Sequence, residues 1–358
     1  MNNFYYITYL SDSINEGGMA RNLAFSDKMN LLGCRRLNMY FYKDNIFRRT
    51  WAGLRLLILL SCHNDKIILA HQSAISLLFP MLTKKVSQIV FKTILTFIAK
   101  NNRLIIEVND LPYEQAIDLD LPIHSSMLEH ENLFYSIPNC HYIFASNEMS
   151  KYVCEKYKID KHFAEVIING GPDALSVPFK LPNKSWIADE NIKYIYAGSL
   201  NKGRQIDQLI DVFRVNASNL LILIGIWGEW LKEIDLPANV IYLGDFEEEK
   251  AHYIVSKCDI GLIPYDETKF YYNLCYPTKA SFYITAGIPF LSTPLLELQN
   301  VFANKHISYF QPFQNWGKFI AGLKKTDLID RKGDIKIEKH KFSWKYQIDQ
   351  YFDEMINE

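Results

Sequence analysis

The chain has 358 residues, of which 49% are hydrophobic and 14% aromatic, and its net charge is −1. This length and composition favour two domains with buried cores and exclude a disordered protein. The longest apolar runs are shorter than a membrane span or carry polar residues, so no transmembrane helix is expected. The six cysteines show no metal-type spacing and are predicted to be reduced thiols.

Short extended segments alternate with helical patterns through the first half of the chain. The extended segments are Phe4–Leu10, Leu37–Phe41, Lys66–Ala70, Leu104–Val108, Tyr142–Ala145 and Ala164–Ile168. This alternation predicts a parallel, doubly wound sheet. The chain leads into the first of these strands without a charged and apolar leader, so we expect a cytoplasmic protein.

Polar residues follow several of these strands. Ligands of open α/β sheets bind beyond the carboxyl ends of the strands, which selects His71, Glu107 and Asp110 as candidate catalytic residues. A carboxylate in such a loop acts as a base, a hydroxyl clamp or a charge partner, whereas a single histidine is also common as a structural residue. Gly17 and Gly18 precede a further helix, where they either allow close approach of a ligand to the backbone or form a simple turn.

Positive charge is concentrated near the N-terminus. Residues 1–100 contain 13 Lys and Arg but 5 Asp and Glu, a net charge of +8, and the basic residues flank two apolar helical stretches. One interpretation is a peripheral seat on an anionic membrane surface, at the inner face of the cell membrane; the other is a pair of helices packed on the sheet with solvated basic ends. No recognition motif accompanies these charges, so nucleic acid is not an expected partner.

The second half of the chain repeats the plan after a predicted hinge, a stretch rich in Gly, Pro, Asn and Ser between Gly170 and Ile192. Its extended segments are Lys193–Ala197, Leu220–Gly225, Val240–Leu243, Asp259–Pro264 and Pro289–Ser292. We therefore expect a second parallel sheet.

A glycine-bounded loop follows the first of these strands and leads into a helical pattern. The loop contains Gly198, Ser199, Lys202 and Arg204. A helix N-terminus attracts anions through its free N–H groups and its dipole, and the two basic side chains add positive charge. The loop is a predicted diphosphate-binding site.

A second helix begins at Tyr276-Pro277-Thr278-Lys279 and ends before Gly287 and Pro289, which form a strong stop signal. Lys279 falls in the first turn, where a cation opposes the helix dipole unless an anion is present. Lys279 is therefore a second candidate phosphate ligand; the alternative is a solvated lysine.

Together these segments resemble the nucleotide-sugar glycosyltransferases of the two-domain GT-B type, in particular the family 4-like group. Gly198–Gly203 with Arg204 is similar to the family pattern G-x-L-x-x-x-K-G, with the lysine one residue early. Asn169-Gly170 followed by Asp173 resembles N-G-x-D, and Ser343-Trp344 resembles a C-terminal S-W. The pattern P-x-K-x-x-x-Y-x-x-A-G-x-P is matched by Pro277, Lys279, Tyr283, Ala286, Gly287 and Pro289.

The chain departs from the family at two glutamates, eight residues apart, that commonly approach the sugar and hold the ribose hydroxyls. Phe282 and Leu274 stand at these positions. The nearby polar candidates for donor binding are Asn273, Tyr276 and Ser281, and the pattern is closer to galactofuranosyl- and glucosyltransferase-type offshoots that read P-x-K-x-S-x-Y. The donor sugar and the stereochemical course are left open.

The resemblance implies two Rossmann-like, doubly wound domains that face each other across a cleft. The expected parts are an acceptor-side domain at 1–172, a linker at 173–191, a nucleotide-sugar-binding domain at 192–342 and a C-terminal helix at 343–358 that crosses back. Gly17 and Gly18 would face the donor phosphates. Metal and other cofactors would not be needed, because Lys279, Arg204 and a helix N-terminus neutralise the leaving diphosphate.

The expected function is hexosyl transfer from a nucleoside-diphosphate donor, UDP-hexose, to a hydroxyl of a glycan or lipid-linked acceptor. The resemblance places this reaction in bacterial surface polysaccharide or glycoconjugate synthesis. Two alternatives are a nucleotide-sugar epimerase of the same fold and a catalytically silent glycosyltransferase-like partner subunit, which the two absent glutamates would explain.

Overall fold

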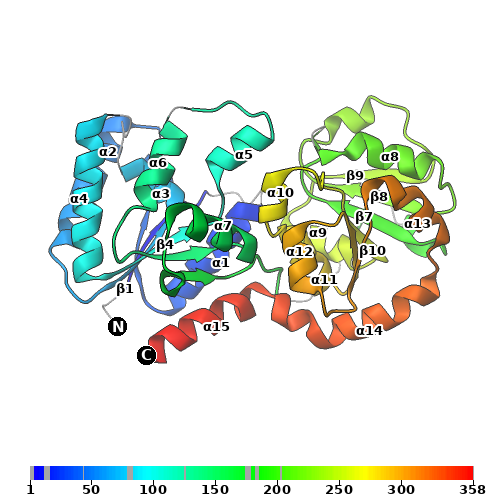
Figure 1. Cartoon of the computed structure of the whole chain (residues 1–358). Coiled ribbons are helices and arrows are strands. Elements are labelled where there is room, and N and C mark those ends of the chain that lie inside the picture. The colour runs from blue at the N-terminus through cyan, green and yellow to red at the C-terminus, as the bar shows by residue number, and fades with distance from the viewer. Residues whose placement is uncertain are drawn as a thin grey trace. The chain divides into compact units, whose positions relative to one another are not determined.

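The computed structural model describes residues 4–11, 17–42, 44–78, 84–124, 126–173, 179–181, 185–201 and 204–357. The chain divides into two compact units (Figure 1). The first comprises Met1–Ser13 and Gly18–Ile168, and the second comprises Ile14–Gly17 and Asn169–Glu358. The expected limits of the linker and the crossing of the C-terminal helix stay predictions.

The first unit contains a parallel six-stranded sheet in the order β2-β1-β3-β4-β5-β6. The strands are β1 (Phe4–Thr8), β2 (Arg35–Asn38), β3 (Ile67–His71), β4 (Arg103–Val108), β5 (His141–Phe144) and β6 (Ala164–Val166). The helices are α1 (Gly17–Leu31), α2 (Ile46–Ser61), α3 (Gln72–Leu78), α4 (Lys85–Asn101), α5 (Pro112–Asp118), α6 (Ser126–Phe134) and α7 (Asn147–Tyr157). The sheet predicted from the alternating pattern is confirmed.

The second predicted strand was placed too late in the chain. β2 ends at Asn38, whose side-chain oxygen accepts hydrogen bonds from the N–H groups of Leu10 and Tyr40. This local turn competes with continued pairing. The apolar residues that follow form a 3₁₀ turn, Met39–Tyr42, with Met39 fully buried.

The second unit contains another parallel six-stranded sheet, in the order β12-β11-β10-β7-β8-β9. The strands are β7 (Lys193–Ala197), β8 (Leu220–Ile224), β9 (Val240–Gly244), β10 (Ile260–Ile263), β11 (Phe290–Ser292) and β12 (Ser308–Phe310). The helices are α8 (Ile206–Arg214), α9 (Glu248–Val255), α10 (Phe270–Leu274), α11 (Thr278–Thr285), α12 (Leu296–Phe302), α13 (Trp316–Gly322), α14 (Ile329–Glu338) and α15 (Trp344–Asn357).

The strand order fixes where each unit can bind a ligand. In a doubly wound sheet, a crevice opens beyond the carboxyl ends of the two neighbouring strands whose connections run in opposite directions. These strands are β1 and β3 in the first unit and β7 and β10 in the second. His71 ends β3, and Gly198 follows β7.

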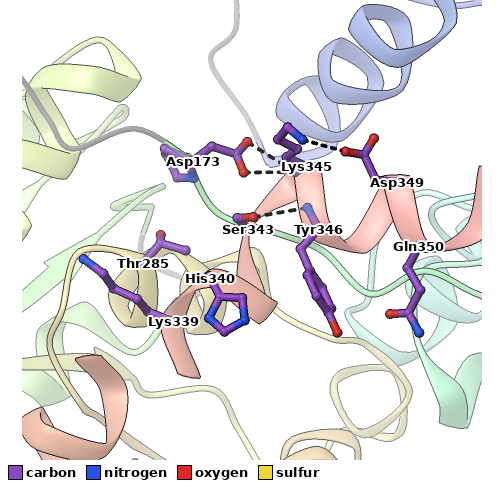
Figure 2. A pocket seen from close by; sticks show the side chains of 10 residues that line it. Asp173, Thr285, Lys339, His340, Ser343, Lys345, Tyr346, Asp349 and Gln350 are labelled. Carbon is purple, nitrogen blue, oxygen red and sulfur yellow. Dashed lines mark hydrogen bonds and ion pairs between the residues drawn. The ribbon is translucent and has the colours of Figure 1, made fainter. Parts of the chain in front are cut away.

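Two segments of the second unit that are about 170 residues apart in sequence form one clasp. The N–H of Gly171 donates to Phe342 O and the N–H of Trp344 donates to Gly171 O, both over 2.9 Å. Both carboxylate oxygens of Asp173 accept the N–H of Lys345, at 3.2 Å, which caps the start of α15 (Figure 2). The N-G-x-D and S-W echoes in the sequence are therefore the two halves of this clasp.

Among the described residues, no helix combines the length and the apolar character needed to cross a bilayer.

The clasp predicts that a side chain at residue 170 destabilises the second unit. A Cβ on Gly170 would lie 2.5 Å from Trp344 N and 2.7 Å from its Cα, and backbone atoms do not yield cheaply. Gly170→Ala should lower the free energy of unfolding by about 1–3 kcal/mol. Gly333→Ala is the control, because that site in α14 is open and should gain about 0.5–1 kcal/mol. Denaturant midpoints measure both, and equal midpoints for the two variants would contradict the clasp.

Candidate functional site

A buried ion pair lies at the carboxyl ends of β3 and β4 in the first unit. Arg21 Nε, from α1, donates to Glu107 Oε1 over 2.5 Å, and its Nη1 donates to Ile167 O over 2.6 Å. Arg21 and Glu107 are only 1% and 2% exposed. Glu107 therefore ties α1 to the end of β4, and Arg21 in turn holds the chain near the end of the unit.

His71 belongs to the same cluster. Its Nδ1 accepts the N–H of Ser73, so the proton of the neutral ring sits on Nε2, which lies 3.4 Å from Glu107 Oε2. Burial lowers the pKa of His71, with a further lowering from Arg21 that Glu107 opposes. The ring is therefore neutral near pH 7, and its Nε2–H faces the carboxylate.

Asp110 is placed differently from Glu107. It follows β4, is only partly buried, and its Oδ1 accepts the N–H of Leu111. With Gln72, His130 and Glu131 it lines a cavity of about 80 Å³. Burial raises the pKa of Glu131 to about 7. The neighbouring Glu114 adds to this rise, and Lys156 opposes it. Asp110 is thus the sequence-predicted carboxylate of the first unit that lines a cavity.

In the second unit, Tyr283 bridges the two strands that diverge at the crevice. β7 and β10 pair at Ile260 with Tyr194 and at Gly261 with Ile195. Beyond these pairs, the Tyr283 hydroxyl accepts the N–H of Ala197 and donates to Leu262 O, each over 3.1 Å. The ring fits because residue 261 is glycine, where a Cβ would clash with the Tyr283 ring. The tyrosine of the P-x-K-x-x-x-Y pattern therefore anchors α11 to both strands.

Lys279 precedes Tyr283 by one helical turn and lies over the end of β7. A Cβ on Gly198 would be 2.7 Å from both Cε and Nζ of Lys279, and Gly198 has φ +138°. Only glycine suits this conformation and this close approach. Lys279 Nζ donates to the Tyr265 hydroxyl over 3.1 Å and lies 5.1 Å from the centroid of the Tyr196 ring.

Arg204 shares Tyr265 with Lys279. Its guanidinium carbon lies 5.0 Å from the centroid of the Tyr265 ring, and its Nη1 donates to the Tyr272 hydroxyl over 3.2 Å. The two tyrosine rings stack with centroids 4.7 Å apart. Burial raises the pKa of Tyr265, but Lys279 and Arg204 outweigh it and the net direction is down. Within the described part of the chain, neither cation has a carboxylate partner.

Other predicted donor ligands of the second unit lie near this cluster. Ser199 and Gly198 begin the loop after β7, while Pro277 and Thr278 begin α11, which has no side-chain cap on its first N–H groups. Gly17 and Gly18 are the first residues of α1, two residues earlier than expected for its start. Lys202 lies outside the described residues.

Three predicted donor ligands use their polar groups within the protein. The Tyr276 hydroxyl bonds Ser281 Oγ over 2.9 Å, and Ser281 Oγ donates to Asn169 O over 2.6 Å, with both residues at most 2% exposed. Asn273 donates to Glu267 O and Lys269 O and accepts the N–H of Leu296. Tyr276 and Ser281 thus hold α11 against Asn169, and Asn273 holds the loop after β10 against α12.

Buried or packed apolar residues stand at the two positions where the family that the sequence resembles carries glutamates. Leu274 is 4% exposed, and the Phe282 ring lies 5.0 Å from that of His252. The pocket in Figure 2, of about 700 Å³, surrounds the clasp and does not include Lys279 or Arg204. Its Lys345 pairs with Asp349 over 2.9 Å.

Sequence reasoning missed Arg21, Tyr196, Tyr265 and Tyr272. Tyr265 follows the predicted strand Asp259–Pro264 directly, so the rule that selects residues after strands would have found it. Arg21 was harder to find from the sequence. The only indication is that this cation shares a face of its helix with apolar residues. The other two tyrosines are not distinguished among the 22 in the chain.

No protein-family model matches the sequence, and no curated protein matches it either. Solved structures do match. HepE of Anabaena, in complex with UDP and glucose, aligns with a TM-score of 0.64 and 14% identity over 99% of this chain and 100% of that one. Sucrose-phosphate synthase of Thermosynechococcus elongatus gives 0.65 and 11% over 99% of each chain. WaaG, a glycosyltransferase involved in lipopolysaccharide biosynthesis, gives 0.63 and 9% over 97% and 98%. The chain has the GT-B fold.

The geometry of the first unit predicts that Glu107 is needed for folding. Glu107→Gln leaves the Arg21 charge buried without its carboxylate and should cost about 3–5 kcal/mol of unfolding free energy. Asp110→Asn is the control, since its oxygen can still accept the N–H of Leu111, and should change stability by less than about 0.5 kcal/mol. Chemical denaturation measures both. Replacing both charges, as Arg21→Met with Glu107→Leu, should restore part of the loss; the absence of any recovery would contradict the charge-based account.

Proposed function

We propose that this protein is a glycosyltransferase that moves a hexose from a UDP-hexose donor to a hydroxyl of a glycan or lipid-linked acceptor. The observation that carries the proposal is the pair of cations at the crevice of the second unit. Lys279 and Arg204 are held over Gly198 and Tyr265 without a carboxylate partner among the described residues. A nucleoside diphosphate supplies the missing negative charge.

The chemistry needs such a charge arrangement. Breaking the bond between the sugar and the diphosphate places negative charge on the leaving group, and preorganised cations stabilise that charge in the transition state. Lys279 stands in the first turn of α11, where the N–H groups carry no side-chain cap and add their dipoles. These groups make a metal unnecessary in our proposal.

The solved structures with this fold support a uridine nucleotide. HepE is described in complex with UDP-glucose, and a pneumococcal O-GlcNAc transferase, GtfA, in complex with UDP and GlcNAc. WaaG acts in lipopolysaccharide biosynthesis, which favours a role in the synthesis of a bacterial surface glycoconjugate. The P-x-K-x-S-x-Y pattern favours the galactofuranosyl- or glucosyltransferase-type offshoot of the family 4-like group.

We assign the acceptor to the first unit. Asp110, which lines the cavity beyond β4, is the candidate base or clamp for the acceptor hydroxyl. Glu107 and His71 have a structural role in this region, because Glu107 forms an ion pair with Arg21 and faces the ring of His71. Gly17 and Gly18 stay candidates for contact with the donor phosphates.

Removing either cation should weaken donor binding. Lys279→Met and Arg204→Met each remove charge-assisted hydrogen bonds worth about 1.5–3 kcal/mol, so UDP affinity should fall about ten- to hundredfold. Calorimetric titration measures this loss. Lys279→Met should also lower the rate at which the bond between the hexose and UDP is cleaved, by more than the loss of donor affinity explains.

Matched control variants exist in the same unit. Lys257 Nζ lies 4.7 Å from the centroid of the Tyr253 ring, and the guanidinium carbon of Arg331 lies 3.8 Å from that of Tyr309, so both pairs reproduce the cation–aromatic contacts outside the crevice. Lys257→Met and Arg331→Met should bind UDP as the parent does. An unchanged affinity in both crevice variants would remove this cluster from the donor site.

A further inference from the structure

The first unit carries two neighbouring helices, α2 and α4, that are apolar on two opposite faces. α2 buries Leu56, Leu57 and Leu60, while α4 buries Phe91, Leu95 and Ile98. The helices pack against each other and lie side by side in Figure 1. In each helix the buried residues form the apolar side that an amphipathic helix packs against the core.

The opposite faces expose large apolar side chains. In α2, Phe47, Trp51, Leu54 and Ile58 recur at helical spacing and are 84%, 65%, 49% and 64% exposed. In α4, Val86, Ile89, Val90 and Phe97 do the same, at 73%, 66%, 46% and 49%. Single exposed apolar residues are common, but two aligned rows on neighbouring helices indicate a surface that is covered in use. We name these eight residues the apolar face.

The two helices themselves carry only positive charges, while the exposed Asp44 and Asp65 lie outside them near their ends. Neither helix contains an Asp or Glu, and their exposed cations are Arg48, Arg55, Lys85, Lys92 and Lys100. A symmetric dimer would place this cationic surface against its own copy, which like-charge repulsion opposes. An anionic bilayer complements both features, because its headgroups attract the cations and its acyl boundary takes up Trp, Phe and aliphatic side chains.

We propose that the apolar face docks the protein on an anionic lipid bilayer, with Phe47 and Trp51 inserted below the headgroups. The proposal does not depend on the donor or on the transfer reaction. It predicts binding by insertion as well as by charge, so salt should weaken the attachment by screening the cations, while loss of the apolar side chains should weaken it at any salt concentration.

The test uses the full chain and vesicles that contain no glycosyl acceptor. Sedimentation should recover the protein with vesicles of phosphatidylcholine plus phosphatidylglycerol and much less of it with phosphatidylcholine alone. Phe47→Ser combined with Trp51→Ser should weaken binding to the anionic vesicles about tenfold or more. Ile337→Ser, at an apolar residue of α14 that is 73% exposed, is the matched control and should bind as the parent does.

Two further readouts separate the alternatives. The fluorescence of the parent should shift to the blue on anionic vesicles, and Trp51→Phe should lose most of this shift while keeping the binding. UDP affinity should be the same in the Phe47/Trp51 variant and the parent, so a failure of the lipid proposal is distinct from a failure of the donor site. Equal recovery with neutral and anionic vesicles would overturn the proposal, as would a solution dimer that the Phe47/Trp51 variant abolishes.

Discussion

The hydroxyl of Tyr283 is the contact on which the site of the second unit depends. Where β7 and β10 stop pairing, this hydroxyl accepts a hydrogen bond from the N–H of Ala197 and donates one to Leu262 O. Two buried backbone groups are thereby satisfied at the point where the crevice opens. Because residues four apart lie on one face of a helix, the same anchor places Lys279 over Gly198. The position of the lysine is thus a consequence of how the strands diverge.

The two units hold positive charge in different ways. Arg21 in the first unit has a carboxylate and a backbone carbonyl as partners, so its charge is satisfied within the fold. Lys279 and Arg204 in the second unit have tyrosine hydroxyls and rings instead. Aromatic partners orient a cation without neutralising it, which leaves the charge available to a bound anion. This contrast is the basis on which we propose a structural role for Arg21 and a ligand-binding role for Lys279 and Arg204.

The sequence predicted both sheets and, in outline, that Gly198, Arg204 and Lys279 lie in one region. Alternating extended and helical patterns located eleven of the twelve strands, with β2 placed two residues late, because most of these strands are short, buried and apolar. β12, a strand of three residues at the edge of the second sheet, was not predicted. Gly198, Arg204 and Lys279 were found from turn and helix-start signals, and the structure brings their side chains or backbone together.

The roles of individual polar residues were harder to predict. Glu107 and Asp110 look equivalent after the same strand, yet the first is committed to an arginine 86 positions earlier and the second lines a cavity. Tyr276 and Ser281 stand beside the predicted phosphate ligands, but their hydroxyls hold Asn169 in place. Such assignments depend on long-range contacts, which local patterns do not encode.

The central claim is that the second unit recognises a diphosphate through unneutralised cations. Calorimetric titration of the parent protein with uridine, UMP and UDP tests this most directly, because the three ligands share the nucleoside and differ in the number of phosphate groups. The account predicts that affinity rises with each phosphate and that the gain from the second phosphate shrinks as salt is added. Equal affinity for uridine and UDP, or no binding of UDP at any salt concentration, would contradict it.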